Sequence, residues 1–177
     1  MSEFLKTEEG KAYFITCTVV DWIDIFTRET YVNILIDSIK YCQKNKGLEV
    51  YAYCILPSHF HMIARAKDGT LGILLKDLKG FTARKILDEI KNNQQESRRE
   101  WLLEAFKKAG AKSSQKQNYQ FWQHDNFPVE LYSDKFIIQK ETYIHMNPVE
   151  IGFVSKPEYY RLSSASDESP IQIMEWR

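Results

Sequence analysis

The chain has 177 residues, a length typical of a single domain, and its 24 basic and 24 acidic residues leave no net charge. Apolar residues make up 44% of the sequence, enough for a packed core, yet no apolar run is long enough to cross a bilayer, so a membrane is not an expected partner. The neutral total argues against a polycation that coats nucleic acid non-specifically, whereas 11 basic against 6 acidic residues at 76–116 still allow a local site for a polyanion.

The first residues and the cysteines indicate a cytoplasmic protein. The opening stretch MSEFLKTEEG has no apolar segment of the kind found in secretory signals, so no signal peptide is expected. Cys17, Cys42 and Cys54 form no CxxC pair, and an odd number of such cysteines is typical of reduced, buried thiols in the cytosol. A zinc site built on cysteine is not expected, for the same reason.

The first predicted elements are a strand and a helix. Residues 11–20, KAYFITCTVV, are rich in β-branched and aromatic side chains, which favours a strand. Apolar residues then recur at the i, i+3, i+4 and i+7 spacing of one helical face, namely at Val32, Leu35, Ile36 and Ile39. Gly47 is typical of the residue just past a helix C-terminus, so this helix should end there.

Two more strands and a second helix follow. Residues 48–56 and 59–66 have the composition of strands, and only Pro57 and Ser58 separate them, which predicts a tight hairpin. An apolar helical pattern begins at Leu71 and continues to Ile90.

The region after this helix is polar. Residues 91–118 contain a small amphipathic patch around Trp101 and end in a predicted flexible segment at about 109–118. Residues 119–122, YQFW, predict a fourth strand.

A third helix is predicted at 133–146, with Ser133 as its N-cap and with its end at Asn147, because Pro148 disfavours a helical conformation there. The order β-α-β-β-α-β with an extra C-terminal helix is that of the α+β ferredoxin-like (RRM-like) fold, an antiparallel sheet with helices on one face. We therefore expect a single domain over residues 1–177, with its core at about 11–166 and the second face of the sheet open to ligands.

Two histidines lie in the third predicted strand. Strand side chains alternate between faces, so Phe60 and Met62 should face the helices, and His59 and His61 should lie side by side on the open face. Two neutral imidazoles at this spacing can chelate one divalent cation. The spacing also occurs by chance, and surface or hydrogen-bonded core histidines remain an alternative.

The last predicted helix carries three polar groups on one side. Tyr143 and Asn147 are one turn apart, and Lys140 lies one turn before the tyrosine. Asn147 could supply a third metal ligand and Lys140 a positive charge beside the phenol. The alternatives are a core aromatic, a helix C-cap and a solvated lysine.

Four segments resemble a known family. LPSHFH (56–61) is similar to the histidine motif of HUH single-strand nucleases, and YIHMNPVEIGFV (143–154), followed by PEYYRLSSA, resembles the C-terminal signature of the single-tyrosine transposases. LKGFTARKI (78–86) and FWQHDNFPVELYS (121–133) resemble two further segments of the same family, which includes insertion-sequence transposases and REP-associated tyrosine transposases. The resemblance extends over about residues 11–166.

The resemblance implies an activity. It makes His59 and His61 ligands of Mg²⁺ or Mn²⁺ and makes Tyr143 the nucleophile that forms a 5′-phosphotyrosine with single-stranded DNA beside a hairpin. It leaves the third ligand open, because Asn147 is one methylene shorter than the glutamine of some relatives. It also implies a prokaryotic, nucleoid-associated protein, with a monomer and a homodimer both represented among relatives.

DNA contacts are expected from two groups of side chains. Cations on or near the second helix should contact phosphates, namely Lys76, Lys79, Arg84 and Lys85. Phe121 and Trp122 are candidates to stack on unpaired bases, with core packing as the alternative.

Three other functions remain open. A domesticated protein could keep the motifs and bind hairpin DNA with little or no transposition activity. An RRM-like RNA-binding domain is a second possibility, but the usual aromatic pattern is missing from the central strands. A metal hydrolase that uses water is the third, and a covalent protein–DNA adduct distinguishes it from the transposase.

Overall fold

The computed structural model describes residues 7–115 and 117–176. Its elements are β1 (Ala12–Thr18), η2 (Val20–Trp22), α1 (Glu29–Lys46), β2 (Leu48–Leu56), β3 (His59–Ala66), α2 (Leu71–Asn92), α3 (Arg99–Lys112), β4 (Val129–Glu130), α4 (Asp134–Glu150) and η3 (Pro157–Tyr159). Residues 1–6, which belong to the stretch without a secretory signal, and residue 116 of the predicted flexible segment lie outside the described residues. Within the described ranges, no helix has the length and apolar character needed to span a membrane.

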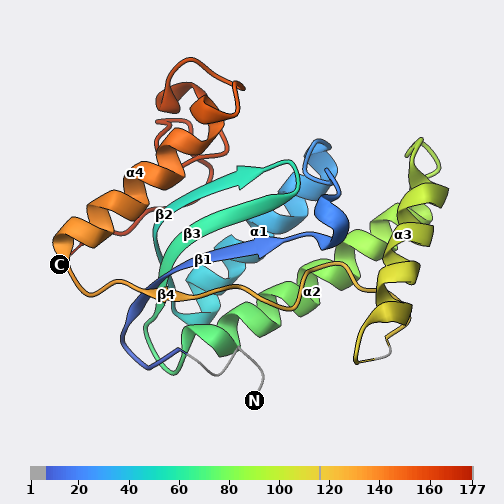
Figure 1. Cartoon of the computed structure of the whole chain (residues 1–177), viewed down its shortest axis with the longest axis horizontal. Helices are drawn as coiled ribbons and strands as arrows, with labels where there is room; N and C mark the ends of the chain where they lie inside the picture. The colour runs from blue at the N-terminus through green and yellow to red at the C-terminus, as the bar shows by residue number, and fades with distance from the viewer. Residues whose placement is uncertain (1–6, 116, 177) are drawn as a thin grey trace.

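The four strands form one antiparallel sheet in the order β2-β3-β1-β4 (Figure 1). β3 lies between β1 and β2, so the connection through α1 crosses over it, and β4 adds to the free side of β1. This strand order is that of the ferredoxin-like fold, so the predicted α+β class is confirmed. The predicted bounds of the β2–β3 hairpin are also confirmed.

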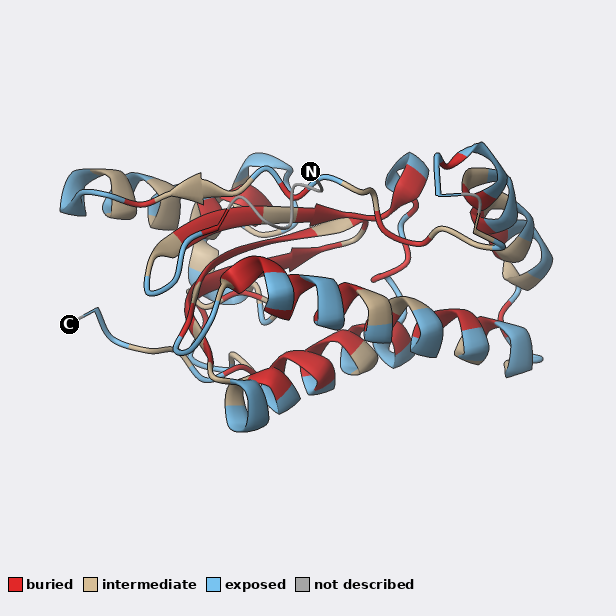
Figure 2. Ribbon diagram, turned by 90° about the horizontal axis from the view of Figure 1, so that it is seen from below, coloured by how far each residue is buried: buried red, intermediate tan, exposed pale blue. Residues whose placement is uncertain are grey.

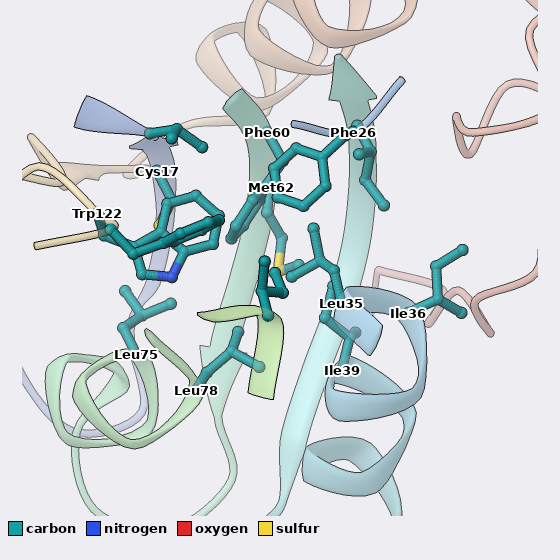
Figure 3. Close-up of a cluster of buried hydrophobic side chains, with 14 of the residues drawn as sticks. Cys17, Phe26, Leu35, Ile36, Ile39, Phe60, Met62, Leu75, Leu78 and Trp122 are labelled. Atoms are coloured by element: carbon teal, nitrogen blue, oxygen red, sulfur yellow. The ribbon is translucent and has the colours of Figure 1, made fainter. Parts of the chain in front are cut away.

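The main core lies between the sheet and the pair α1 and α2, which cover the same face (Figure 2). Figure 3 shows Phe60 and Met62 of β3 in one apolar cluster with side chains of both helices, among them Leu35 of α1 and Leu78 of α2. The predicted stripe of α1 is buried, and Gly47 ends the helix in the left-handed conformation (φ 68°) that glycine adopts without strain. The periodicity of the sequence therefore fixes which face of the sheet the helices cover.

The second face of the sheet is less open than expected, because α4 lies across part of it (Figure 2). Ile144 of α4 packs with Phe14, Cys54, Leu56 and Ile63 in a second apolar cluster. These strand residues are apolar, and their burial by α4 removes that surface from water. The helix thus brings its own polar side chains to the face that carries the histidines.

The C-terminal segment protects the outer edge of β2. Ser164 N donates to Tyr53 O at 2.9 Å, and Met174 N donates to Val50 O at 2.8 Å. An unpaired edge strand invites pairing with another chain, and these bonds satisfy several of its backbone groups.

Two predictions about the middle of the chain are wrong. The fourth strand is Val129–Glu130, whereas residues 119–122 form only a single bridge between Trp122 and Val19. The segment's aromatic residues fill the core from a loop, which a strand-like composition cannot distinguish from a strand. The segment expected to be flexible from residue 109 is helical to Lys112, because α3 packs Leu102 and Phe106 into the core.

The last helix also differs from its prediction at one end. Ser133 caps its N-terminus as expected, accepting a bond from Phe136 N at 3.4 Å. At the other end α4 continues through Asn147 and Pro148 to Glu150. The bias of a proline against a preceding helical residue is a tendency only, and here the helix ends two residues after the proline.

Candidate active site

The two histidines lie side by side at the beginning of β3. Their ring centroids are 4.9 Å apart, and both rings face the side of the sheet opposite Phe60 and Met62, as the strand alternation predicted. His59 is half-buried, and His61 is only 5% exposed. The pair therefore forms a partly enclosed site with an accessible end at His59.

A hydroxyl group contacts one nitrogen of each ring. Thr16 Oγ1 lies 2.8 Å from His61 Nδ1, because Thr16 of β1 pairs directly with His61 in the sheet register. Ser58 Oγ lies 3.2 Å from His59 Nδ1. Among the described residues, neither Nε2 atom has a hydrogen-bond partner. Hydroxyl partners on Nδ1 hold the rings and leave Nε2 free to bind a ligand.

Both imidazoles are neutral at physiological pH. Burial, together with the smaller effects of the nearby His59 and Lys140, lowers the pKa of His61 to about 3. Burial also lowers the pKa of His59, while the charge of Asp24 opposes that shift. Neutral imidazole is the form that coordinates a metal ion, so the environment of the pair favours ligation.

Helix α4 places Tyr143 next to this pair. Its ring centroid is 5.3 Å from that of His61 and 5.8 Å from that of Phe14, and the side chain is 41% exposed. Phe14 in turn stacks on His61 at 5.5 Å. A phenol, two imidazoles and a phenyl ring from three separate elements thus form one cluster, with the phenol at its accessible side.

Lys140 and Asn147 flank Tyr143 on the same helix. Lys140 Nζ lies 4.7 Å from the centre of the Phe14 ring and 5.9 Å from that of Tyr143, so the cation packs against the aromatic cluster. Asn147 is 8% exposed, and its Nδ2 donates to the Tyr143 carbonyl at 3.0 Å. Its Oδ1 has no hydrogen-bond partner in the part of the chain that the structure describes.

In the described part of the chain, no three His, Cys, Asp or Glu side chains converge to form a complete metal site. The two imidazoles therefore need a different third ligand. Asn147 Oδ1 fits this requirement chemically, because amide oxygens bind hard cations such as Mg²⁺ and Mn²⁺.

The residues predicted to bind DNA are not brought to this site. Lys76, Arg84 and Lys85 are exposed on α2, which covers the opposite face of the sheet from the histidines. Lys79 is buried, and its Nζ donates to Gln123 O at 2.7 Å and to Asn126 Oδ1 at 2.6 Å. Its geometry is that of an anchor for the loop after α3, so a phosphate contact does not fit.

Phe121 and Trp122 do not fit a stacking role either. They are 2% and 5% exposed and pack on Phe106, Phe26 and Phe60 in the main core. Trp122 Nε1 also donates to Thr82 Oγ1 at 3.0 Å. The alternative of core packing is the one that their burial supports.

Three residues of the site were missed by the sequence analysis. Phe14 and Thr16 lie on the same face of β1, and alternation alone would have grouped them, but their neighbours depend on the pairing of β1 with β3. Trp22, whose ring centroid lies 5.1 Å from that of His59, gave no signal because it follows a predicted strand in an irregular segment.

Comparisons with known proteins bear on the family and on the fold of this chain. The family model described as Transposase IS200 like matches residues 12–108, which include both histidines and end before Tyr143. None of the curated proteins matches the chain.

Two solved structures resemble it. A REP-associated tyrosine transposase bound to a REP hairpin superposes with a TM-score of 0.63 at 18% identity, over 89% of this chain and 78% of that one, which shows a shared fold. A transposase candidate from Deinococcus radiodurans R1 gives a TM-score of 0.44 at 16% identity, over 79% of this chain and 95% of that one, and adds no argument. Because the family model covers more than half of the sequence, the chain belongs to the IS200-like transposase family.

Proposed function

We propose that this protein is a metal-dependent single-stranded DNA endonuclease and strand transferase that acts beside DNA hairpins through a 5′-phosphotyrosine on Tyr143. The observation that carries the proposal is the contact of the Tyr143 ring, from α4, with His61 of β3, whose ring in turn contacts that of His59. A nucleophile beside two neutral imidazoles with free Nε2 atoms is the arrangement that phosphodiester transfer needs.

Family membership supports the reaction class, and the similar structure with a bound REP hairpin supports hairpin DNA as the substrate. The protein would act in the cytoplasm at the nucleoid of a prokaryote, as a monomer or as a homodimer.

The residues present fit a divalent cation, Mg²⁺ or Mn²⁺. His59 and His61 would bind it through Nε2, and Asn147 would bind it through Oδ1, with Thr16 and Ser58 holding the rings in place. When bound, the cation neutralises charge on the scissile phosphate and orients it.

Tyr143 performs the covalent step. Its Oη forms a bond to phosphorus while the bond from phosphorus to the 3′-oxygen breaks, so a 5′-phosphotyrosine and a free 3′-hydroxyl result. The phenol proton leaves Oη, and the departing 3′-oxygen takes up one proton. Because one phosphodiester replaces another, a second 3′-hydroxyl can reverse the step and join a new strand without ATP.

Lys140 assists the same step through its charge. Its ammonium group packs on the ring of Tyr143, so it would stabilise the negative charge that grows on the phosphoryl group during the transfer. A free phenol is almost fully protonated at neutral pH, so the attack needs activation by the metal, by Lys140 or by a bound water.

The proposal is tested with a labelled single-stranded hairpin taken from the flanks of the gene. Wild-type protein should form an adduct that survives denaturing electrophoresis, and the adduct should need Mg²⁺ or Mn²⁺ and disappear with EDTA. His59→Ala and His61→Ala should fold but form none. Tight hairpin binding with no adduct under any metal would instead favour the domesticated DNA-binding protein, and cleavage without an adduct would favour a hydrolase that uses water.

A further inference from the structure

The geometry points to a stacking groove for an unpaired DNA base, formed by Trp22 and Trp101 beside the His59 end of the site. This inference rests on the proposed function and extends it by naming the surface that receives the strand next to the scissile phosphate.

A continuous row of rings leads from the nucleophile to this groove. The centroid separations are 5.3 Å from Tyr143 to His61, 4.9 Å from His61 to His59, and 5.1 Å from His59 to Trp22. The row therefore extends the site in one direction, away from α4 and towards α3.

Trp22 is exposed and is held in an unfavourable backbone conformation. Its side chain is 59% exposed, and both it and Asp21 have positive φ angles, 54° and 52°. Positive φ is costly for a bulky residue, and two consecutive cases persist only where the surroundings enforce them.

Here the surroundings do enforce it, because hydrogen bonds join both flanks of η2 to the hairpin that carries the histidines. Val19 N donates to Ser58 O at 2.9 Å, and Phe26 N donates to Pro57 O at 2.8 Å. The strained turn thus holds an indole in water next to His59, where it gains little from burial. Strain of this kind is typical of functional sites.

A hollow of about 520 Å³ is lined by Trp22 and by residues of α3, among them Trp101, which is 55% exposed. This volume falls in the range of about 300–1,000 Å³ of small-ligand pockets, so it can hold a nucleotide. Exposed aromatic rings are the usual platforms for unpaired bases, because every base has a π-face.

The charged side chains that line the hollow indicate that base stacking would contribute more to DNA affinity than contacts with phosphates. Its lining has three acidic and three basic side chains. Arg98 Nη1 donates to the Asp24 carbonyl at 2.9 Å, and Lys108 pairs with Glu104 at 2.7 Å. Lys112 is exposed and has no ion pair with any described residue. Its ammonium group is therefore available to contact one phosphate of the strand.

The experiment compares variants on a hairpin oligonucleotide whose unpaired 5′ flank carries 5-iodo-deoxyuridine at successive positions. Trp22→Ala should weaken binding by about 5- to 150-fold without changing the slope of log K against log salt. Trp22→Phe should recover part of the affinity. Lys112→Ala should make the salt slope shallower by about 1. Trp176→Ala is the matched control, because that indole stacks on Tyr51 at 4.0 Å, near the opposite end of β2 from the histidine pair.

Irradiation should crosslink one flank position to Trp22 and a neighbouring position to Trp101, as read by mass spectrometry of the peptides. Normal affinity of Trp22→Ala and Trp101→Ala, with normal adduct formation by the wild type, would overturn the groove and leave the proposed function intact. No adduct from the wild type would contradict the proposed function, and the groove inference with it. A melting temperature within a few degrees of wild type shows that each variant is folded.

Discussion

Replacing Thr16 by valine tests how the site holds His61. Valine keeps the shape of the side chain and removes only the hydroxyl that lies 2.8 Å from His61 Nδ1. Metal binding through Nε2 requires the tautomer in which Nδ1–H donates to this hydroxyl. We expect the variant to fold and its affinity for Mn²⁺ to fall.

The size of the effect follows from burial. His61 is 5% exposed, so Nδ1–H has little access to water once its acceptor is gone. A buried donor left without a partner lowers the free energy of unfolding by about 1–3 kcal/mol. If the ring rotates to recover a partner, the cost appears as lost metal affinity, and removal of such supporting groups typically weakens metal binding by about 10- to 100-fold. The penalty of the unpaired donor and the loss of metal affinity are therefore of similar size.

Calorimetric titration with Mn²⁺ and the rate of adduct formation measure the effect. Thr18→Val is the matched control, because Thr18 is buried on the same strand and faces His59, yet its hydroxyl has no hydrogen bond to either imidazole among the described residues. Equal Mn²⁺ affinity in wild type and Thr16→Val, or an equal loss in Thr18→Val, would refute the reasoning.

Three further variants separate the roles of individual side chains. Lys140→Met should slow adduct formation by roughly 10- to 100-fold at unchanged hairpin affinity, less than a buried oxyanion donor, because the lysine is partly exposed and screened; an unchanged rate would exclude its role. Asn147→Ala should weaken Mn²⁺ affinity by about tenfold, less than His61→Ala does, and an equal or larger loss would rank the ligands wrongly. Lys79→Met should lower the free energy of unfolding by about 2–4 kcal/mol in a urea titration, since Gln123 O and Asn126 Oδ1 lose their donor, while the folded variant still forms the adduct; normal stability with lost DNA binding would restore the predicted phosphate contact.

The hairpin and its histidines could be predicted from the sequence because the signals there are local. Residues 48–56 and 59–66 alternate or are β-branched, and only a two-residue turn separates them. Once the strand is known, alternation fixes the face of each histidine. Helical spacing singled out Tyr143 together with Lys140 and Asn147, whereas its role as nucleophile came from the resemblance. Its contact with His61 depends on where α4 crosses the sheet.

Other parts of the site could not be predicted, because they depend on tertiary structure. The pairing of Thr16 with His61 is set by the register of β1 against β3, which lie far apart in the sequence. The positive φ of Trp22 is enforced by the hydrogen bonds of its neighbours to the hairpin, and the residue itself carries no sign of it.

The predicted DNA contacts of Lys79, Phe121 and Trp122 do not fit the burial of these side chains, for a different kind of reason. Lys79 lies four residues after Leu75 and three before Thr82, so it belongs to the buried stripe of α2, and its helical position already argued against a phosphate contact. Phe121 and Trp122 have strand-like composition but enter the core from a loop. Amino-acid composition indicates which side chains tend to be buried or charged. It does not indicate whether a side chain in a loop points into the core or towards solvent.

The most direct test of the central proposal is mass spectrometry of the covalent complex. Wild-type protein is incubated with the hairpin oligonucleotide and Mn²⁺, denatured, and digested with protease and nuclease. We predict a phosphonucleotide on Tyr143, and we predict that Tyr143→Phe binds the hairpin with near-normal affinity but gives no modified peptide and no nicked DNA. A phosphonucleotide on another of the ten tyrosines, or an adduct that persists in Tyr143→Phe, would contradict the account.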